Sequence, residues 1–318
     1  MLPDYLPIVH VSRSPGDPES CSRLFDVLLE QIAQKGVRVG VVERFVQQSK
    51  AIIEDRDILQ SIASSDLLVV NGQCDRDCAK LYLGHHAGIK ENLETTSPRF
   101  SCSDISDAVA CADTVFNWLK TCMKNTPLWG CVLIGGRSSR MGYPKHLIDG
   151  GDGKSWLERS VDLLSSQVAS IVISGQGDIP PLLNSLKRID DLPGLSGPMA
   201  GISAVIKQYP FVSWIVMACD MPDITIESIR WIIEQQRPGR LAIIPQNPTT
   251  GRGEPLYGWY DFRCAPLFAR LAGKGEMRMN RLGECVGVYS PVIPGKLVSA
   301  WRNVNRPEEL DHPPLMQS

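Results

Sequence analysis

The sequence has no apolar run longer than a buried strand, so it predicts no transmembrane helix and no membrane partner. It also has no excess of one charge, because 33 lysines and arginines stand against 35 aspartates and glutamates. No broad basic surface is therefore expected, which argues against nucleic acid as a partner. Internal repeats, coiled-coil heptads and low-complexity stretches are also missing. The hydrophobic content of 43% is sufficient for two domain cores.

A secretory signal and a cysteine framework are absent as well. The N-terminus has an acidic Asp4 and no basic stretch before an apolar run, so no signal peptide is expected. The ten cysteines are scattered, and we expect them to be thiols in the cytoplasm. Cys74, Cys78, His85 and His86 suit zinc by ligand type. Their spacing is poor for one ion, because adjacent histidines rarely both reach it, so it favours ordinary surface and core roles.

Strand-length apolar runs alternate with helical patterns in two series, which meet at residues 125–127. We predict an α/β chain with one domain at residues 1–125 and a second at 127–318. In the first domain, the patterns predict strands at residues 8–11, 37–42 and 67–70 and helices at 22–35 and 104–124. Residues 75–103 lose this pattern, and surface structure is expected there.

The second series begins with a continuous apolar run at residues 129–134, which suits a strand buried on both faces. Further strands are predicted at residues 170–174, 213–218 and 241–245, separated by helical segments such as 156–167 and 225–236. Parallel strands with crossover helices form a doubly wound, Rossmann-like sheet. Such sheets bind ligands outside the carboxyl ends of their strands, so the residues that follow each run are the site candidates.

A glycine-rich segment, residues 133–145, follows the first of these strands. Its glycines let backbone N–H groups approach a triphosphate closely. Arg137, Arg140 and Lys145 supply cations that can hold phosphates and stabilise pyrophosphate as it leaves. The alternative is an ordinary strand-to-helix turn with solvated basic residues. The segment is not a P-loop, because Lys145 does not close a G-x-x-x-x-G-K-[ST] signature, and this disfavours kinase-type phosphoryl transfer.

A carboxylate stands at the end of another predicted strand, where Asp220 follows the apolar run of residues 214–217. Its side chain would emerge at the ligand-binding edge, where a carboxylate is suited to hold Mg²⁺. The alternative role is the N-cap of the helix predicted near Thr225, for which Asp223 is better placed. Asp220 is therefore the predicted metal ligand, with Mg²⁺ as the cofactor.

Five motifs follow one another along the second domain. They are Leu-x-Gly-Gly at 133–136, Arg-Met-Gly-x-x-Lys at 140–145, Gly-Pro-Met-Ala-Gly at 197–201, Cys-Asp-Met-Pro at 219–222 and Asn-Val-Asn-x-Pro-Glu-Glu-Leu at 303–310. In this order they resemble the molybdenum cofactor guanylyltransferase family, whose close relatives transfer CMP to the same pterin. One such motif is weak evidence, but five in family order are hard to produce by chance.

The resemblance implies roles for individual residues. Leu133, Gly135 and Gly136 resemble guanine and ribose contacts. Lys145 resembles the triphosphate-binding lysine, and Asp220 resembles the ligand of Mg²⁺ and the nucleotide. Together with Arg140, Lys145 and Asp220 are the expected catalytic residues, with Arg137 as a further nucleotide contact.

Three more residues extend the implied site. Asp191 resembles an acidic nucleotide contact shortly before the Gly-Pro-x-Ala-Gly loop. Asn303 and Asn305 resemble a closing Asn-x-Asn pair near the pterin and the metal. Neutral amides there can orient oxygens without adding charge.

The chain departs from the family pattern at three places. Pro144 stands where guanylyltransferases commonly carry aspartate, and proline is frequent there in the cytidylyl relatives. Ser174 stands where the family often has an asparagine, and residues 254–256 read Glu-Pro-Leu in place of His-Pro-Thr. The Leu-x-Gly-Gly and Gly-Pro-x-Ala-Gly motifs favour guanine over cytosine.

The implied reaction is in-line attack by a phosphate oxygen of molybdopterin on the α-phosphorus of Mg·GTP. It transfers GMP, forms the guanine dinucleotide cofactor and releases pyrophosphate. A phosphate nucleophile is already ionised at neutral pH, so no general base is expected. Apo-proteins or chaperones of molybdenum enzymes are the other expected partners. Rival interpretations are a cytidylyltransferase for the same pterin, a sugar-phosphate nucleotidyltransferase, and a non-catalytic carrier of the pterin cofactor, which would not need Lys145 and Asp220.

The first domain resembles the GTP-binding adaptor domains that are fused to guanylyltransferases, but it lacks their P-loop signature. No lysine occurs before Lys35, and Asp17 and Glu19 would repel a phosphate held after the first strand. Asn71 ends another predicted strand where an acidic residue would be expected to serve magnesium. We interpret residues 1–125 as a P-loop-like adaptor domain that has lost nucleotide turnover. An unrelated α/β domain is the alternative.

Overall fold

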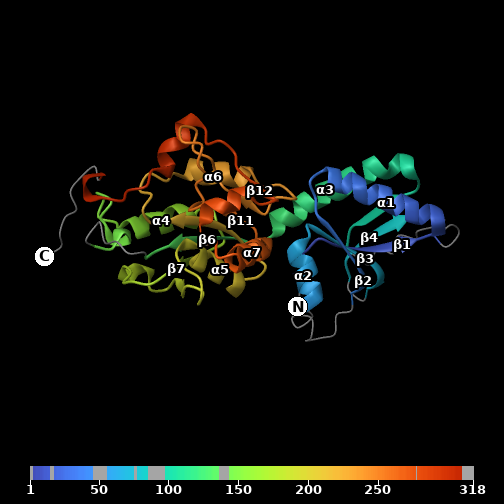
Figure 1. Cartoon of the computed structure of the whole chain (residues 1–318), viewed down its shortest axis with the longest axis horizontal. Helices are drawn as coiled ribbons and strands as arrows, with labels where there is room; N and C mark the ends of the chain where they lie inside the picture. Colours follow the sequence, from blue (N-terminus) through green and yellow to red (C-terminus); the bar gives the residue numbers. More distant parts are fainter. Residues whose placement is uncertain are drawn as a thin grey trace. The chain divides into compact units, whose positions relative to one another are not determined.

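The structure is a computed structural model, and it describes residues 3–14, 18–45, 56–74, 77–84, 97–135, 143–276 and 278–309. The chain divides into two compact units. One unit contains Met1–Thr126 and Arg237–Gly239, and the other contains Pro127–Gln236 and Arg240–Ser318. Each unit, called here the N-terminal and the C-terminal domain, is built on its own sheet (Figure 1).

The N-terminal domain is a five-stranded parallel sheet with strand order β2-β3-β1-β4-β5. Its strands are β1 (Ile8–Arg13), β2 (Val39–Phe45), β3 (Leu67–Cys74), β4 (Ala79–Leu83) and β5 (Arg99–Cys102). Its helices are α1 (Pro18–Gln34), α2 (Arg56–Ser64), the short 3-10 turn η2 (Ile105–Asp107) and α3 (Ala108–Asn125).

Two strands of this sheet lie where the sequence predicted only surface structure, within residues 75–103. The short β4 alternates buried and half-buried residues, with Lys80 and Tyr82 on the half-buried side. This alternation is typical of a half-buried strand, but it spans only five residues, which is too short to stand out in a polar stretch of sequence. The pairing of β4 with β1 on one side and with β5 on the other stabilises it instead.

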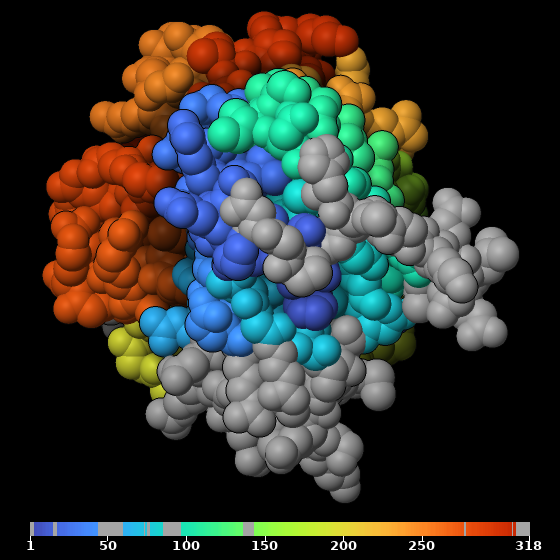
Figure 2. Space-filling model, turned by 90° about the vertical axis from the view of Figure 1, so that its right-hand side faces the viewer, coloured from blue at the N-terminus to red at the C-terminus, as the bar shows by residue number. Residues whose placement is uncertain are grey.

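Successive residues along the strands of the N-terminal sheet face its two opposite sides. Val9 and Val11 of β1 pack with residues of α1 and α3 in one buried cluster. Figure 1 shows both helices on the same face of the sheet, with α2 on the other. In the space-filling view, the blue surface of α1 adjoins the green surface of α3 (Figure 2). This arrangement is the α/β layering that the sequence predicted.

The C-terminal domain has a seven-stranded mixed sheet with order β12-β10-β11-β9-β6-β7-β8. Its strands are β6 (Leu128–Leu133), β7 (Ser170–Ser174), β8 (Lys187–Ile189), β9 (Ser213–Ala218), β10 (Ala242–Ile243), β11 (Tyr257–Tyr260) and β12 (Val288–Tyr289). Its α-helices are α4 (Trp156–Ser165), α5 (Pro198–Gln208), α6 (Ile226–Glu234) and α7 (Ala265–Gly273). The strands β6, β7, β8 and β9 are parallel, whereas β11 is antiparallel to β9 and β10.

Helices cover both faces of this second sheet (Figure 1). On β9, Ile215 and Met217 belong to the cluster that α4 and α6 cover, whereas Trp214 and Val216 belong to the cluster that α5 and α7 cover. All six residues of β9 are buried, which explains its continuous apolar sequence. The doubly wound fold class predicted for this domain is confirmed.

Within the described ranges given above, no helix is both long enough and apolar enough to cross a membrane.

Candidate active site

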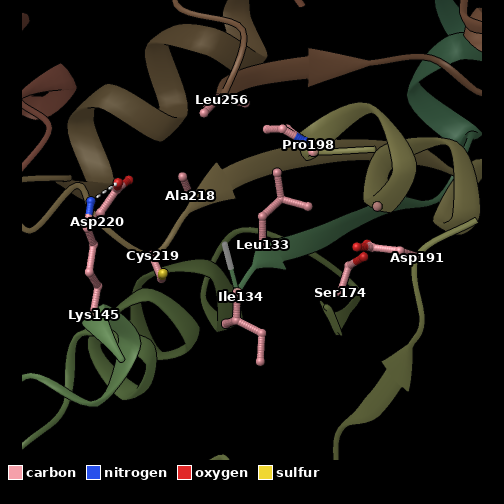
Figure 3. A pocket seen from close by; sticks show the side chains of 13 residues that line it. Leu133, Ile134, Lys145, Ser174, Asp191, Pro198, Ala218, Cys219, Asp220 and Leu256 are labelled. Carbon is pink, nitrogen blue, oxygen red and sulfur yellow. Dashed lines mark hydrogen bonds and ion pairs between the residues drawn. The ribbon is translucent and has the colours of Figure 1, made fainter. Parts of the chain in front are cut away.

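A pocket of about 330 Å³ opens at the carboxyl ends of β6, β7 and β9 (Figure 3). Neighbouring parallel strands place their last residues at one edge, and α/β sheets bind ligands there. Thirteen residues line the pocket: Leu133, Ile134, Gly135, Lys145, Ser174, Asp191, Gly197, Pro198, Gly201, Ala218, Cys219, Asp220 and Leu256.

Lys145 enters the pocket from η3 (Lys145–Leu147), a single 3-10 turn. Its Nζ donates to Asp220 Oδ2 at 2.9 Å and to Asn305 Oδ1 at 2.8 Å. The side chains of Lys145 and Asp220 are 16% and 21% exposed, so solvent screens this ion pair less than a surface pair. The lysine is thereby held at the edge where a polyanion would enter (Figure 3).

Asp220 follows β9, and its two carboxylate oxygens differ in their contacts. Its Oδ1 is buried and has no hydrogen-bond partner among the described residues. An unpaired carboxylate oxygen is costly to bury, and it is the type of ligand that Mg²⁺ prefers. The site therefore fits the predicted metal. The alternative role as an N-cap is excluded, because Thr225 caps α6 with its own side chain.

The other end of the pocket is formed by Ser174 and Asp191, whose side chains point toward one another in Figure 3. Ser174 is 1% exposed, and its Oγ has no hydrogen-bond partner in the described part of the chain. Asp191 lies at the rim. Partial desolvation, with a smaller contribution from Asp190, raises the pKa of Asp191 above its ordinary value. A buried hydroxyl and a destabilised carboxylate both gain from a ligand that offers hydrogen-bond donors.

Two glycines make this end accessible. A Cβ at Gly201 would lie 2.7 Å from Ser174 Oγ and 3.4 Å from Asp191 Oδ1. A Cβ at Gly175, which has φ +113°, would lie 2.0 Å from the carbonyl oxygen of Ile134. A side chain at Gly201 would fill the space beside Ser174 and Asp191, and one at Gly175 would collide with the backbone that follows β6. The Gly-Pro-Met-Ala-Gly motif therefore has a steric reason for glycine at position 201.

Most of the predicted site residues with described positions come together. Leu133, Gly135, Asp191, Lys145 and Asp220 line the pocket. Asn305 contacts Lys145, whereas Asn303 is exposed and does not line the pocket. The remaining predicted residues, Gly136, Arg137 and Arg140, lie outside the described residues.

Sequence reasoning missed part of the pocket. Ser174 was noted only as a departure from the family pattern, and Cys219 was named only as part of the Cys-Asp-Met-Pro motif, with no role of its own. Both end or follow a parallel strand, which is the signal that could have identified them. Burial, with a smaller contribution from the charge of Asp220, raises the pKa of the Cys219 thiol to about 12, which disfavours its thiolate form.

The zinc alternative in the N-terminal domain gains no support. Cys74 and Cys78 place their Sγ atoms 3.7 Å apart, but His85 and His86 lie outside the described residues. In the described ranges, no group of three or more metal-binding side chains is present.

The N-terminal sheet carries different chemistry at its carboxyl edge. Arg13, at the end of β1, donates from Nη2 to Asn71 Oδ1 at 2.8 Å, and Asn71 Nδ2 donates to Glu43 Oε1 at 3.2 Å. A guanidinium beside the end of β3 opposes binding of a second cation there. Asp17 lies outside the described residues, and Glu19 is in the first turn of α1.

Comparison with known proteins gives matches in the C-terminal domain. Residues 130–284 match the family described as "MobA-like NTP transferase domain". A "Probable molybdenum cofactor guanylyltransferase" from Bacillus mycoides is 31% identical over 190 residues, which cover 57% of this chain and 92% of the relative. A "Molybdenum cofactor biosynthesis bifunctional protein" from Synechocystis is 31% identical over 196 residues, 60% of this chain, and the chain spans only 54% of its length.

The solved structures that match this chain include that of the molybdopterin-guanine dinucleotide biosynthesis protein A from Archaeoglobus fulgidus. It is 24% identical with a TM-score of 0.48, and the match covers 57% of this chain and 93% of the other.

The doubly wound sheet and its family match define the C-terminal domain as a nucleotidyltransferase domain. The chain belongs to the molybdenum cofactor guanylyltransferase family of MobA-like transferases.

Proposed function

We propose that this protein transfers GMP from Mg·GTP to molybdopterin and releases pyrophosphate. The observation that carries the proposal is the contact of Lys145 with Asp220 and Asn305 at the end of β9. A lysine and a metal-binding carboxylate side by side suit a triphosphate, whose charge must be neutralised before another anion can attack it.

The chain's own residues supply orientation and charge. Lys145 Nζ would donate to phosphate oxygens and stabilise the pyrophosphate that leaves. Asp220 would hold Mg²⁺ through its carboxylate, and the ion would neutralise phosphate charge when bound. The phosphate of the acceptor is ionised at neutral pH, so proton abstraction by a side chain is not required. Catalysis would then come from positioning two anions in line and from stabilising the charge that develops.

The choice of guanine is supported by the end of the pocket away from Lys145. Guanine presents two adjacent donors on its Watson–Crick edge, N1–H and the 2-amino group, and a carboxylate can accept from both. Cytosine presents one amino donor beside an acceptor nitrogen, which would face the Asp191 carboxylate unfavourably. Asp191 and the unpaired Ser174 Oγ therefore favour GTP over CTP.

The test is Mg²⁺-dependent pyrophosphate release by the full-length protein with molybdopterin, comparing GTP, CTP and ATP. We expect release with GTP and little with the other two. Release with CTP alone would make the protein a cytidylyltransferase. No release with any triphosphate, together with retained pterin binding, would support a carrier instead.

A further inference from the structure

The turn that carries Lys145 also carries a buried histidine to which the proposed reaction assigns no role. His146 is 3% exposed, and its Nε2 lies 2.7 Å from the carbonyl oxygen of Asp178. The two residues are 32 positions apart in the sequence. This hydrogen bond therefore joins η3 to the loop that follows β7.

The protonation of this histidine follows from its surroundings. Burial lowers the pKa of His146 below its ordinary value, and the positive charge of Arg188 acts in the same direction. The hydrogen bond to Asp178 and the charge of its carboxylate oppose this change. A carbonyl oxygen only accepts, so Nε2 carries the proton and donates.

The loop after β7 is shaped to receive the imidazole ring. Gly177 has φ +128°, and a Cβ there would lie 3.3 Å from His146 Cε1. The same loop is fixed on its other side, because Arg188 Nη2 donates to the carbonyl oxygen of Gly175 at 3.1 Å. His146 thus anchors to a loop that is itself held in place.

The position of this loop relates the anchor to the pocket. It begins directly after Ser174, which lines the end of the pocket away from Lys145. The backbone of Lys145 lies next to His146 in the same 3-10 turn. The side chain of His146 therefore links η3, which carries Lys145, to the loop that follows Ser174 at the proposed base-binding end of the pocket.

We propose that His146 is a positioning residue that sets the location of Lys145 Nζ for the triphosphate. This inference rests on the proposed function of the site. A side chain that only fills the core would be replaceable by any apolar group of similar size. An anchor requires the donor at Nε2, and its loss lets η3 shift by fractions of an ångström, which is enough to weaken a preorganised contact.

The matched variants are His146→Gln, which keeps an amide N–H donor at a similar reach, and His146→Leu, which fills the space without one. Affinity for Mg·GTP is measured by calorimetric titration of the full-length protein, and KM and kcat by pyrophosphate release. We expect His146→Leu to raise both Kd and KM for GTP about tenfold, and His146→Gln to stay within about threefold of the unsubstituted protein. KM for molybdopterin should change little.

His10→Leu provides the control for loss of a half-buried histidine that contacts a backbone carbonyl. His10 Nε2 lies 2.9 Å from the carbonyl oxygen of Gly72 in the N-terminal domain. This variant should lower the unfolding temperature without changing Kd for Mg·GTP. If His146→Leu does not fold, Gly177→Ala tests the same contact from the other side. Its methyl group would press on the ring and its positive φ would strain the loop that receives the ring, so this variant should also raise Kd.

Equal affinity of His146→Leu and the unsubstituted protein would overturn the proposal. So would equal losses in His146→Gln and His146→Leu, since the donor would then be irrelevant. Absence of pyrophosphate release by the unsubstituted protein would instead refute the proposed function, while the ratio of nucleotide affinities between the two variants still decides the role of His146.

Discussion

The two domains differ at the edge where their parallel strands end. In the C-terminal domain, Lys145 reaches Asp220 and Asn305, and one oxygen of Asp220 remains unpaired among the described residues. In the N-terminal domain, Arg13 is bonded to Asn71, and its guanidinium also lies 5.3 Å from the ring centre of Phe25. The edge of the C-terminal sheet keeps a cation and a carboxylate in position for a ligand. At the edge of the N-terminal sheet, the cation is engaged by neighbouring side chains.

This difference teaches that a parallel sheet supplies only the location of a site. The chemistry depends on a few side chains after the strands, and these can be lost while the core that supports them remains. The buried clusters of both domains contain the apolar residues that each sheet requires. We therefore propose that the N-terminal domain keeps a scaffold without nucleotide turnover.

The largest effect is expected from the ion pair of the C-terminal site. Lys145→Ala and Asp220→Ala should each lower kcat/KM for GMP transfer by about 10³-fold or more, because the triphosphate loses a preorganised charge partner. Lys154→Ala is the matched control, since Lys154 is an exposed lysine of the same domain that pairs with Asp162 at 2.6 Å. Near-normal pyrophosphate release by either site variant would remove the proposed contrast between the domains.

The next effect concerns base selection. Asp191→Asn should reduce the preference for GTP over CTP, measured as the ratio of their kcat/KM values, by about tenfold or more, because an amide cannot accept from two adjacent donors as a carboxylate does. The neighbouring carboxylate of Asp190 is exposed and does not line the pocket, so Asp190→Asn serves as the control. An unchanged ratio in Asp191→Asn would place the recognition of the base elsewhere.

A smaller effect is expected in the pH dependence of stability. The pKa of His146 is lowered from 6.5 in the folded protein, so the unfolded chain binds its proton first as the pH falls. The free energy of unfolding should therefore decrease below about pH 6.5, and the decrease should be shallower in His146→Gln. The measurement is denaturant unfolding of the C-terminal domain in the unsubstituted protein and in His146→Gln at pH 7.5 and 5.5. Equal decreases in the free energy of unfolding of the two proteins would contradict the prediction.

The smallest effect on transfer is expected in the N-terminal domain. Arg13→Ala should leave kcat/KM within about twofold while costing about 1 kcal/mol of stability through the lost hydrogen bond. Titration of the unsubstituted protein with Mg·GTP should show one site per chain, which Lys145→Ala removes. A second site that survives in Lys145→Ala would mean that the N-terminal domain still binds nucleotide.

The sequence predicted the parts of this molecule that depend on periodic burial or on short motifs. The strands at residues 170–174 and 213–218 coincide with β7 and β9, because each contains an uninterrupted apolar run. Lys145 and Asp220 were predicted from motifs that lie 75 residues apart, and the structure brings them into contact. The fold and the charged centre of the site were thus accessible without coordinates.

Other features depend on contacts between distant residues and left little trace in the sequence. The short strands β4 and β5 have only five and four residues, and they are stabilised by pairing with each other and, for β4, with β1. The unpaired Oγ of Ser174 depends on which groups surround it after folding. The contact of His146 with Asp178 depends on the approach of two loops, which no local pattern encodes.

The 160 residues that separate Lys145 from Asn305 have a consequence during protein synthesis. The ribosome makes the lysine long before the amide that accepts from it, and the backbone N–H of Val304 that donates to the Asp220 carbonyl comes equally late. A nascent chain can pair β6 with β7 and β9 before either contact exists. Chains that end before residue 303 would then keep the contact of Lys145 with Asp220 but lack the Asn305 acceptor, so the last polypeptide segment of the site is the one that completes the fixing of the lysine.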